Sequence, residues 1–346
     1  MSDSSHPRYI RQARFACIGD EGQTRLGRGR VLIAGCGALG SVIANTLARS
    51  GVGFLRIVDR DYLELNNLQR QVLYDEEDVR SGLPKAIAAA EKLRQINSEV
   101  EIEPIVSDIN FSNIESFCDG MDVIVDGTDN FEIRFLLNDA SIALGIPWIY
   151  GGCIGADGQS MTIIPGESPC LACLMSEGPP APGTTATCDS AGILAPIINI
   201  IASIESTEAI KILSGNRDQV SQSLSVFDIW NNRSHQLSLA SLKSSRADCK
   251  VCGQKDFEWL SGRRGSQSAV LCGRNSVQLT FPGESLDFDK LEKELTVVGD
   301  VSRNPFLIKA TIGEYQLTLF PDARAIITGT EDIATAKTVY AKYVGH

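Results

Sequence analysis

A glycine-rich turn lies early in the chain, between a short apolar run and a helix-like run. Gly35, Gly37 and Gly40 form a G-x-G-x-x-G pattern that follows residues 31–34. Glycines at this spacing allow a tight turn and let the backbone approach a phosphate group at a helix N-terminus. Asp59 follows 19 residues after Gly40, where an acid can hydrogen-bond a ribose hydroxyl. The pattern predicts a nucleotide site; the alternative is a structural turn that binds no nucleotide.

Two cations further along the chain favour ATP over NAD as that nucleotide. Arg70 lies in the run Asn67-Leu-Gln-Arg-Gln71, and Lys85 follows a proline that opens a predicted helix. Arginine and lysine side chains neutralise the charge of a triphosphate, and a nicotinamide does not need them. An NAD-dependent oxidoreductase, the nearest rival enzyme, would also need a placed His, Lys or Tyr for hydride transfer, and none is evident.

Two acids follow a predicted buried strand over residues 121–125. Asp126 and Asp129 come just after its carboxyl end, the edge that carries ligands in open α/β sheets. A carboxylate there can hold Mg²⁺ against ATP phosphates. The alternative is that Asp129 or Asn130 caps the following helix.

Four cysteines form two C-x-x-C pairs that are separated by 75 residues: Cys170, Cys173, Cys249 and Cys252. Four thiolates complete the tetrahedral coordination of a structural zinc ion. A zinc ion here would tie two distant chain segments together. The alternatives are a chance repetition of the pattern or a redox dithiol.

Cys188 follows a Gly- and Pro-rich segment, residues 178–183, which we interpret as a mobile loop. The cysteine precedes a predicted long helical region. A thiol near a helix N-terminus has a lowered pKa and can act as a nucleophile, but a free cysteine is more often a small buried hydrophobe. Both interpretations stay open.

The rest of the pattern predicts an α/β protein with a Rossmann-like, doubly wound, mostly parallel sheet. Strands are predicted at 31–34, 54–58, 100–106, 121–125 and 147–151, helices at 38–50, 84–96, 131–144 and 195–213, and an antiparallel pair at 223–229 and 233–239. Residues 152–187, rich in Gly, Pro, Ser and Thr, are assigned no strand.

We expect two domains, at residues 1–260 and 269–346, with a linker over 261–268. In the second, the pattern predicts strands at 276–281, 306–311, 315–320 and 325–328 and helices at 288–295 and 332–343. These elements make a small α+β domain, to which the sequence assigns no role.

The composition limits which partner molecules and which cellular compartment we expect for the protein. Of the 346 residues 43% are hydrophobic and 22% charged, as in an ordinary globular protein. The net charge of -11 argues against nucleic acid as the main partner. The polar N-terminal residues lack the apolar segment of a secretory signal, and no apolar run is long enough to span a membrane. We therefore expect a cytoplasmic protein whose cysteines are thiols or metal ligands.

These motifs, in this order, resemble the bacterial MoeB/ThiF family, which is related to the adenylation domains of ubiquitin-activating enzymes. The matching pieces are Arg8-Tyr-Ile-Arg-Gln12, Gly35-Cys-Gly-Ala-Leu-Gly40, Asp59-x-Asp61, Asn67-Leu-Gln-Arg-Gln71, Pro84-Lys85, Thr128-Asp-Asn130, Cys170-x-x-Cys173, Cys188-x-x-Ala-Gly192, Glu208-Ala-Ile-Lys211 and Cys249-x-x-Cys252.

The resemblance implies an adenylyltransferase. A small ubiquitin-like sulfur-carrier protein of the ThiS or MoaD type offers its C-terminal Gly-Gly carboxylate, which Mg-ATP adenylates with release of pyrophosphate. Sulfur from a donor such as a cysteine desulfurase then yields a thiocarboxylate for thiamine, molybdopterin or thiolated-tRNA synthesis. The sequence does not name the carrier. ATP, Mg²⁺ and Zn²⁺ are the implied cofactors.

The resemblance also implies roles for single residues. Asp59, with Asp61 beside it, would bind the ribose; Arg70 and Lys85 would neutralise phosphates, with Asn67 and Gln71 nearby; and Asp129 would ligate Mg²⁺. Arg11 would reach into the site of a neighbouring subunit, which implies a homodimer. Cys188 matches a mobile-loop cysteine that bonds covalently to the carrier or its sulfur in some members and is dispensable in others.

Two further functions stay open. The chain could activate a ubiquitin-like protein for conjugation instead of sulfur transfer, or it could be a relative that binds a carrier without catalysis. The presence of Arg70, Lys85 and Asp129 argues against the second.

Overall fold

The computed structural model describes residues 7–176, 178–179, 191–264, 268–271, 275–281 and 285–345. The chain divides into two compact units, Met1–Arg264 and Gly265–His346. Among the described residues, no helix combines the length and the apolar character needed to cross a membrane.

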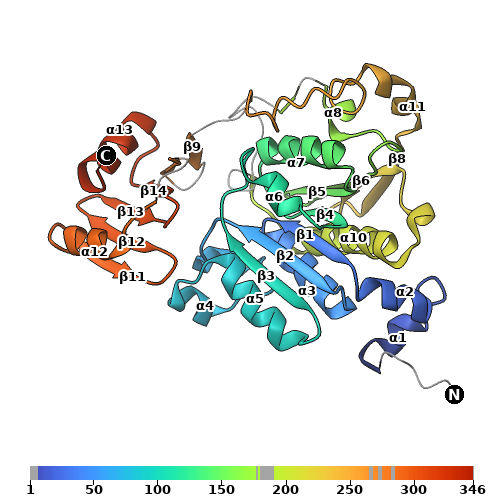
Figure 1. Cartoon of the computed structure of the whole chain (residues 1–346), viewed down its shortest axis with the longest axis horizontal. Coiled ribbons are helices and arrows are strands. Elements are labelled where there is room, and N and C mark those ends of the chain that lie inside the picture. The colour runs from blue at the N-terminus through green and yellow to red at the C-terminus, as the bar shows by residue number, and fades with distance from the viewer. Residues whose placement is uncertain are drawn as a thin grey trace. The chain divides into compact units, whose positions relative to one another are not determined.

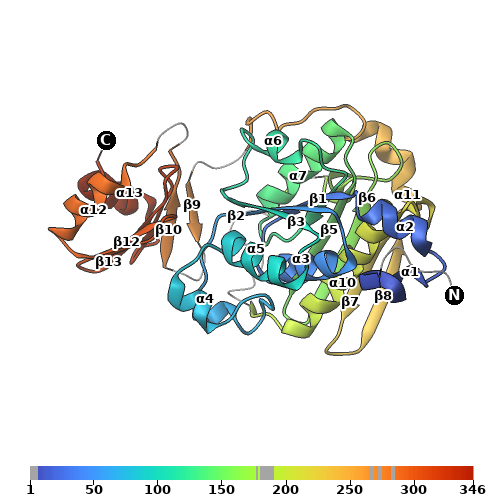
Figure 2. The ribbon, with the colours of Figure 1, turned by 60° about the horizontal axis from the view of Figure 1, so that its bottom comes forward.

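The first unit contains an eight-stranded sheet with the order β3-β2-β1-β4-β5-β6-β7-β8 (Figures 1 and 2). Its strands are β1 (Arg30–Ala34), β2 (Phe54–Asp59), β3 (Glu101–Val106), β4 (Val123–Asp126), β5 (Trp148–Ile154), β6 (Asp157–Ile163), β7 (Ser223–Asp228) and β8 (Arg233–Ser238). Strands β1 to β5 pair in parallel, and β6 to β8 add antiparallel strands at one side. The predicted mostly parallel, doubly wound sheet is confirmed.

Helices cover both faces of this sheet, so that each face has its own apolar core (Figure 2). The helices α3 (Ala38–Ser50), α5 (Lys85–Ile96) and α10 (Ala195–Ser214) lie on one face, and α6 (Ile114–Cys118) and α7 (Phe131–Leu144) lie on the other. The remaining helices are α1 (Ile10–Ala13), α2 (Gly19–Leu26), α4 (Glu76–Ser81), α8 (Leu171–Leu174) and α11 (Ala240–Lys243), with short 3₁₀ turns at Pro7–Tyr9, Leu65–Asn67, Arg217–Gln219 and Ser244–Asp248. Burial on both faces explains why the parallel strands read as continuous apolar runs.

Strand β6 is absent from the sequence-based prediction, which was wrong here. Its residues pair antiparallel with those of β5: Ile163 lies opposite Trp148 at one end of the pairing, and Asp157 lies opposite Ile154 at the other. Gly158 allows helix α10 to pack on the strand, because a Cβ there would lie 2.5 Å from Ile201. The Gly, Gln, Ser and Thr of this strand hide it from a hydrophobic pattern. Of the predicted loop over 178–183, residues 180–183 lie outside the described residues.

The second unit is a six-stranded antiparallel sheet with the order β11-β12-β13-β14-β10-β9 (Figure 1). Its elements are β9 (Ser268–Leu271), β10 (Ser276–Leu279), α12 (Phe288–Thr296), β11 (Asp300–Arg303), β12 (Ile308–Ile312), β13 (Tyr315–Leu319), β14 (Ala325–Thr328) and α13 (Ile333–Tyr343). The two edge strands, β9 and β11, were not predicted, and β9 begins at the last residue of the predicted linker. Apolar side chains from the sheet and both helices form a third core.

Candidate functional site

The glycine turn joins β1 to α3 at the carboxyl edge of the parallel strands. Gly35 has a φ of +85°, which side chains rarely adopt. A Cβ on Gly40 would lie 2.0 Å from the carbonyl oxygen of Gly35. The backbone conformation of this turn therefore requires glycine at both positions.

The third glycine of the motif has a different environment. Gly37 is the N-cap of α3 and no side chain caps the helix, so the first amide groups of α3 point outward. Among the described residues, the only heavy atom within 4 Å of a Cβ built on Gly37 is Nε2 of Gln71, at 3.9 Å. Gln71 is 3% exposed, and its Oε1 has no hydrogen-bond partner among the described residues. Open space and the first amides of α3 suit an anionic group. The unpartnered Gln71 oxygen is an acceptor, so it suits a hydrogen-bond donor on the same ligand.

Asp59 connects the glycine turn to the end of β2. Its carboxylate accepts hydrogen bonds from the Cys36 amide at 2.6 Å and from the Asp61 amide at 2.7 Å. Burial raises the pKa of Asp59; the Lys85 ammonium opposes this rise, and the Asp61 carboxylate adds to it. The carboxylate is thereby held in one orientation beside the turn.

Lys85 lies at the first position of α5 and is 4% exposed. Its Nζ lies 3.0 Å from Oδ2 of Asp61. A cation at a helix N-terminus is opposed by the helix dipole, and burial of an ammonium group costs solvation energy. The ammonium is held there beside the carboxylates of Asp61 and Asp59.

Tyr74 connects the glycine turn to α5, a role that the sequence analysis did not predict. Its hydroxyl lies within hydrogen-bond distance of the Cys36 carbonyl, at 2.7 Å, and of the Lys85 carbonyl, at 3.2 Å. Tyr74 therefore joins the glycine turn to the start of α5. Burial raises the pKa of the Cys36 thiol to about 12, so this cysteine packs as a neutral thiol.

The segment after β2 places Asn67 and Arg70. Asn67 is buried, and its Oδ1 accepts from the Glu64 amide at 3.1 Å. Arg70 is half-buried, and its guanidinium donates to the Asn66 carbonyl at 2.8 Å. This contact uses one of the five donors of a guanidinium, which leaves most of them for a ligand.

The two acids after β4 have different environments. Asp126 is fully buried; its carboxylate accepts from Arg134 Nε at 3.0 Å and from the Thr128 hydroxyl at 2.7 Å. Asp129 is exposed and has no hydrogen bond or ion pair to any residue that the structure describes. The Arg134 guanidinium already pairs with Asp126, which leaves Asp129 as the stronger candidate for a cation ligand.

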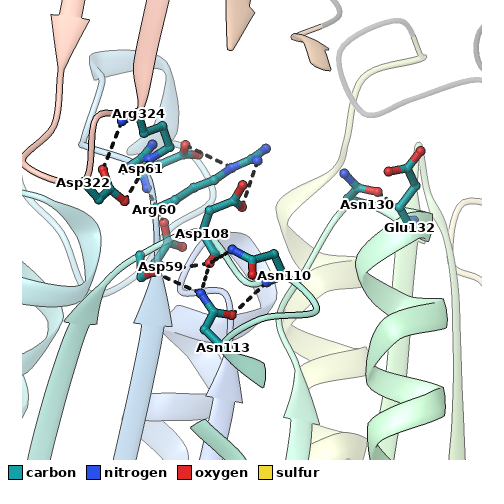
Figure 3. A network of polar contacts seen from close by, with 11 residues as sticks. Asp59, Arg60, Asp61, Asp108, Asn110, Asn113, Asn130, Glu132, Asp322 and Arg324 are labelled. Atoms are coloured by element: carbon teal, nitrogen blue, oxygen red, sulfur yellow. Dashed lines mark hydrogen bonds and ion pairs between the residues drawn. The ribbon is translucent and has the colours of Figure 1, made fainter. Parts of the chain in front are cut away.

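Asn130 takes the capping role that the sequence left open between two residues. Its Oδ1 accepts from the Glu132 amide at 2.7 Å at the start of α7 (Figure 3). Asp129 is thereby left without a structural task and remains the candidate cation ligand.

Beside Asp59, an ion pair that the sequence analysis missed joins the ends of β2 and β3 (Figure 3). The Arg60 guanidinium lies 3.1 Å from the carboxylate of Asp108 and 3.9 Å from that of Asp61. The pair was not visible in the sequence because its members are 48 residues apart.

The four paired cysteines converge, as the spacing predicted. Their sulfur atoms all lie within 4.8 Å of one another, with Cys170 to Cys249 at 3.7 Å and Cys173 to Cys252 at 3.4 Å. Zinc–sulfur bonds of about 2.3 Å in tetrahedral geometry place sulfur atoms about 3.8 Å apart. The cluster fits a four-thiolate metal site.

One predicted residue, Arg11, is not brought to this site. Arg11 is exposed on α1, and its neighbour Tyr9 contacts Gly51 and accepts a hydrogen bond from Asn97. Both partners precede the strands β2 and β3, so α1 lies at the amino edge of the sheet, opposite to the glycine turn. Cys188 lies outside the described residues.

Comparison with known proteins gives a consistent result. The model of the ThiF family matches residues 9–251. The chain is 44% identical to the Sulfur carrier protein ThiS adenylyltransferase of Bacillus subtilis, over 98% of this chain and 99% of that protein. It is 34% identical to the Sulfur carrier protein adenylyltransferase of Thermus thermophilus, over 74% of this chain and 97% of the relative.

A third relative and a solved structure extend this picture. The SAMP-activating enzyme E1 of Haloferax volcanii is 37% identical over 71% of this chain and 88% of its own length. A crystal structure of E. coli MccB with ATP aligns with a TM-score of 0.59 at 22% identity, over 69% of this chain and 73% of that one. At that identity the likeness supports the fold alone.

Proposed function

The chain belongs to the ThiF family, and we propose that it uses ATP to adenylate the C-terminal Gly-Gly carboxylate of a small ubiquitin-like sulfur-carrier protein. The relative that matches almost the whole chain is named an adenylyltransferase of ThiS. A carrier of the ThiS type is therefore the first candidate substrate, and carriers of the MoaD type are the second.

The carboxyl edge of β1 and β2 supplies the nucleotide site in this proposal. The open amides at Gly37 and the cations Arg70 and Lys85 bind the phosphates. Asp59 accepts hydrogen bonds from the ribose hydroxyls, with Asp61 orienting Lys85. Asn67 and Gln71 complete the polar wall around the phosphates.

Adenylation itself needs orientation and charge neutralisation more than covalent help. The carrier carboxylate attacks the α-phosphorus, the bond from that phosphorus to the bridging oxygen breaks, and pyrophosphate leaves. Asp129 would hold the Mg²⁺ that neutralises the phosphates. Its carboxylate is exposed, and the backbone of Gly127 and Thr128 just before it packs against Gly35 of the glycine turn; both observations support this role.

The four-cysteine cluster would hold Zn²⁺ in a structural role. All four ligands come from the protein, so no coordination position is left for a substrate. The ion would join the α8 region to residues 249–252, two segments that are distant in sequence.

Arg11 and Cys188 have proposed roles that depend on other molecules. Since Arg11 lies at the opposite sheet edge from its own glycine turn, its contribution requires a second subunit, in a homodimer. The Cys188 thiol would attack the carbonyl carbon of the carrier's acyl-adenylate, so that a thioester to the carrier forms and AMP leaves. A separate donor protein would supply the sulfur.

One observation carries the proposal. The buried Lys85 ammonium and the uncapped N-terminus of α3, both suited to phosphate, lie beside Asp59, the acid expected to bind the ribose. The test is ATP–pyrophosphate exchange with candidate Gly-Gly-ending carriers, added one at a time. Exchange that depends on one carrier supports the proposal. Tight ATP binding without exchange for any ThiS- or MoaD-type carrier would contradict it and would favour the non-catalytic alternative.

A further inference from the structure

Arg60 immediately follows the ribose-site acid Asp59 and is held in place by carboxylates. Its guanidinium lies 3.1 Å from Asp108 and 3.9 Å from Asp61. Figure 3 shows Arg60 and Asp108 side by side. Their side chains are 23% and 19% exposed, so the pair is largely buried but keeps some contact with solvent.

The loop after β3 fixes Asp108 in turn. Asn113 Nδ2 donates to the Asp108 carbonyl at 2.8 Å, and its Oδ1 accepts from the Asn110 amide at 2.9 Å. A loop closed by these side-chain bonds presents the carboxylate in one position. The guanidinium that it binds is therefore pre-organised before any ligand arrives.

The order of the strands indicates which part of a bound nucleotide lies near Arg60 and Asp108. In this kind of fold the turn after β1 binds the phosphates, and the acid at the end of β2, here Asp59, binds the ribose. Asp59 pairs in register with Val106, the last residue of β3, so Asp108 lies just beyond Asp59 on the side away from the glycine turn. The base must extend in that direction, because the ribose separates it from the phosphates.

The charge of Arg60 argues for contact with a base instead of a phosphate. Asp108 pairs with the guanidinium and Asp61 lies 3.9 Å from it, whereas Arg70 keeps most of its donors available. A guanidinium held at its edge by a carboxylate can pack its planar face on an aromatic ring.

From this geometry we infer that Arg60 is a base-contacting residue: its guanidinium, held by Asp108, packs on the face of the purine of bound ATP. The inference rests on the proposed function only in taking ATP as the nucleotide. Asp108 acts through Arg60 and is a positioning residue.

The test is calorimetric titration of the full chain with ATP and with ribose 5-triphosphate, which lacks the base. Arg60→Ala should weaken ATP binding about threefold to thirtyfold and change the binding of ribose 5-triphosphate less than about twofold. Arg60→Lys keeps the ion pair but lacks the planar face, so it should show the same base-dependent loss in a protein that folds normally.

Arg56 provides the matched control. It lies on the same strand as Arg60 and pairs with Glu103 of β3 at 2.5 Å, but several residues before the carboxyl edge. Arg56→Ala should leave the affinities for both ligands unchanged. Equal weakening of both ligands by Arg60→Ala, or no weakening of either, would overturn the inference, as would a wild-type chain that binds both ligands equally. Failure of pyrophosphate exchange with every carrier would reject the proposed function without changing these binding results.

Discussion

Lys85 contacts Asp61 twice: Nζ donates to the carboxylate at 3.0 Å, and the Lys85 amide donates to the Asp61 carbonyl at 2.8 Å. This double contact joins the start of α5 to the loop after β2. It also places opposite charges beside Asp59. Burial raises the pKa of Asp59, the Lys85 ammonium lowers it, and the Asp61 carboxylate raises it. The ionisation of Asp59, the residue proposed to bind the ribose, therefore depends on both neighbours.

The pH dependence of ATP binding should reveal this coupling. An ionised Asp59 accepts hydrogen bonds from the ribose, so affinity should fall as the pH falls through its raised pKa. Asp61→Asn removes a negative neighbour and should move the acid limb to lower pH. Lys85→Met removes a positive neighbour and should move the limb to higher pH. The measurement is the dissociation constant for ATP across about pH 5 to 8 for the wild type and both variants. Because the ionisation of ATP itself is the same in all three titrations, acid limbs that superimpose would contradict the coupling.

The glycines of the turn should separate folding from binding. Gly40→Ala places a Cβ against the Gly35 carbonyl, so it should lower the free energy of unfolding by about 3 kcal/mol or more. Gly37→Ala meets only Gln71 Nε2 at 3.9 Å and should cost at most about 1 kcal/mol. The new methyl group would, however, occupy the space in front of the α3 amides, and ATP affinity should fall about tenfold. Denaturant unfolding and calorimetry measure the two effects. A Gly37→Ala protein that binds ATP normally would show that phosphate does not approach this glycine.

Asp129 and Asn130 form a matched pair for the proposed Mg²⁺ site. Asp129→Asn should reduce carrier-dependent exchange about a hundredfold or more, because the exposed carboxylate is the proposed ligand. Its folding stability should change by less than about 0.5 kcal/mol. Asn130→Ala removes the α7 cap and should show the reverse: about 1 kcal/mol less stability and nearly normal exchange. Normal exchange in Asp129→Asn at limiting Mg²⁺ would remove Asp129 from the mechanism.

The cysteine cluster predicts one zinc ion per chain. Cys249→Ser should abolish stoichiometric zinc and lower the thermal midpoint, because the four-thiolate site contributes to folding. Cys17→Ser, at an exposed cysteine, is the control and should leave both unchanged. Elemental analysis of the purified wild-type protein decides the matter first: a chain that folds fully with no bound metal would contradict a structural zinc site.

The parallel core of the fold was predictable because its strands are apolar runs and its helices have clear ends. Helices 38–50 and 131–144 were predicted with the bounds that the structure shows. Strand β6 was not predicted, because Gly, Gln, Ser and Thr fill positions that the neighbouring strands and α10 bury. The edge strands β9 and β11 are short, and hydrophobic patterning alone does not mark them.

The site was predictable where function depends on local sequence and obscure where it depends on pairing across the sheet. The spacing of the glycines and Asp59 is a local signal. Asp126 and Asp129 looked alike as ligands, and only the burial of Arg134 against Asp126 distinguishes them. The pair of Arg60 and Asp108 requires the adjacency of β2 and β3, which only the structure provides.

The most direct test of the central claim is intact-mass spectrometry of a ThiS-type carrier after incubation with the protein and Mg-ATP. The account predicts a carrier that is heavier by one adenylyl group at its C-terminus, absent with Lys85→Met and absent from a carrier without its final glycine. An unmodified carrier under conditions where the protein binds Mg-ATP and the carrier would contradict the account.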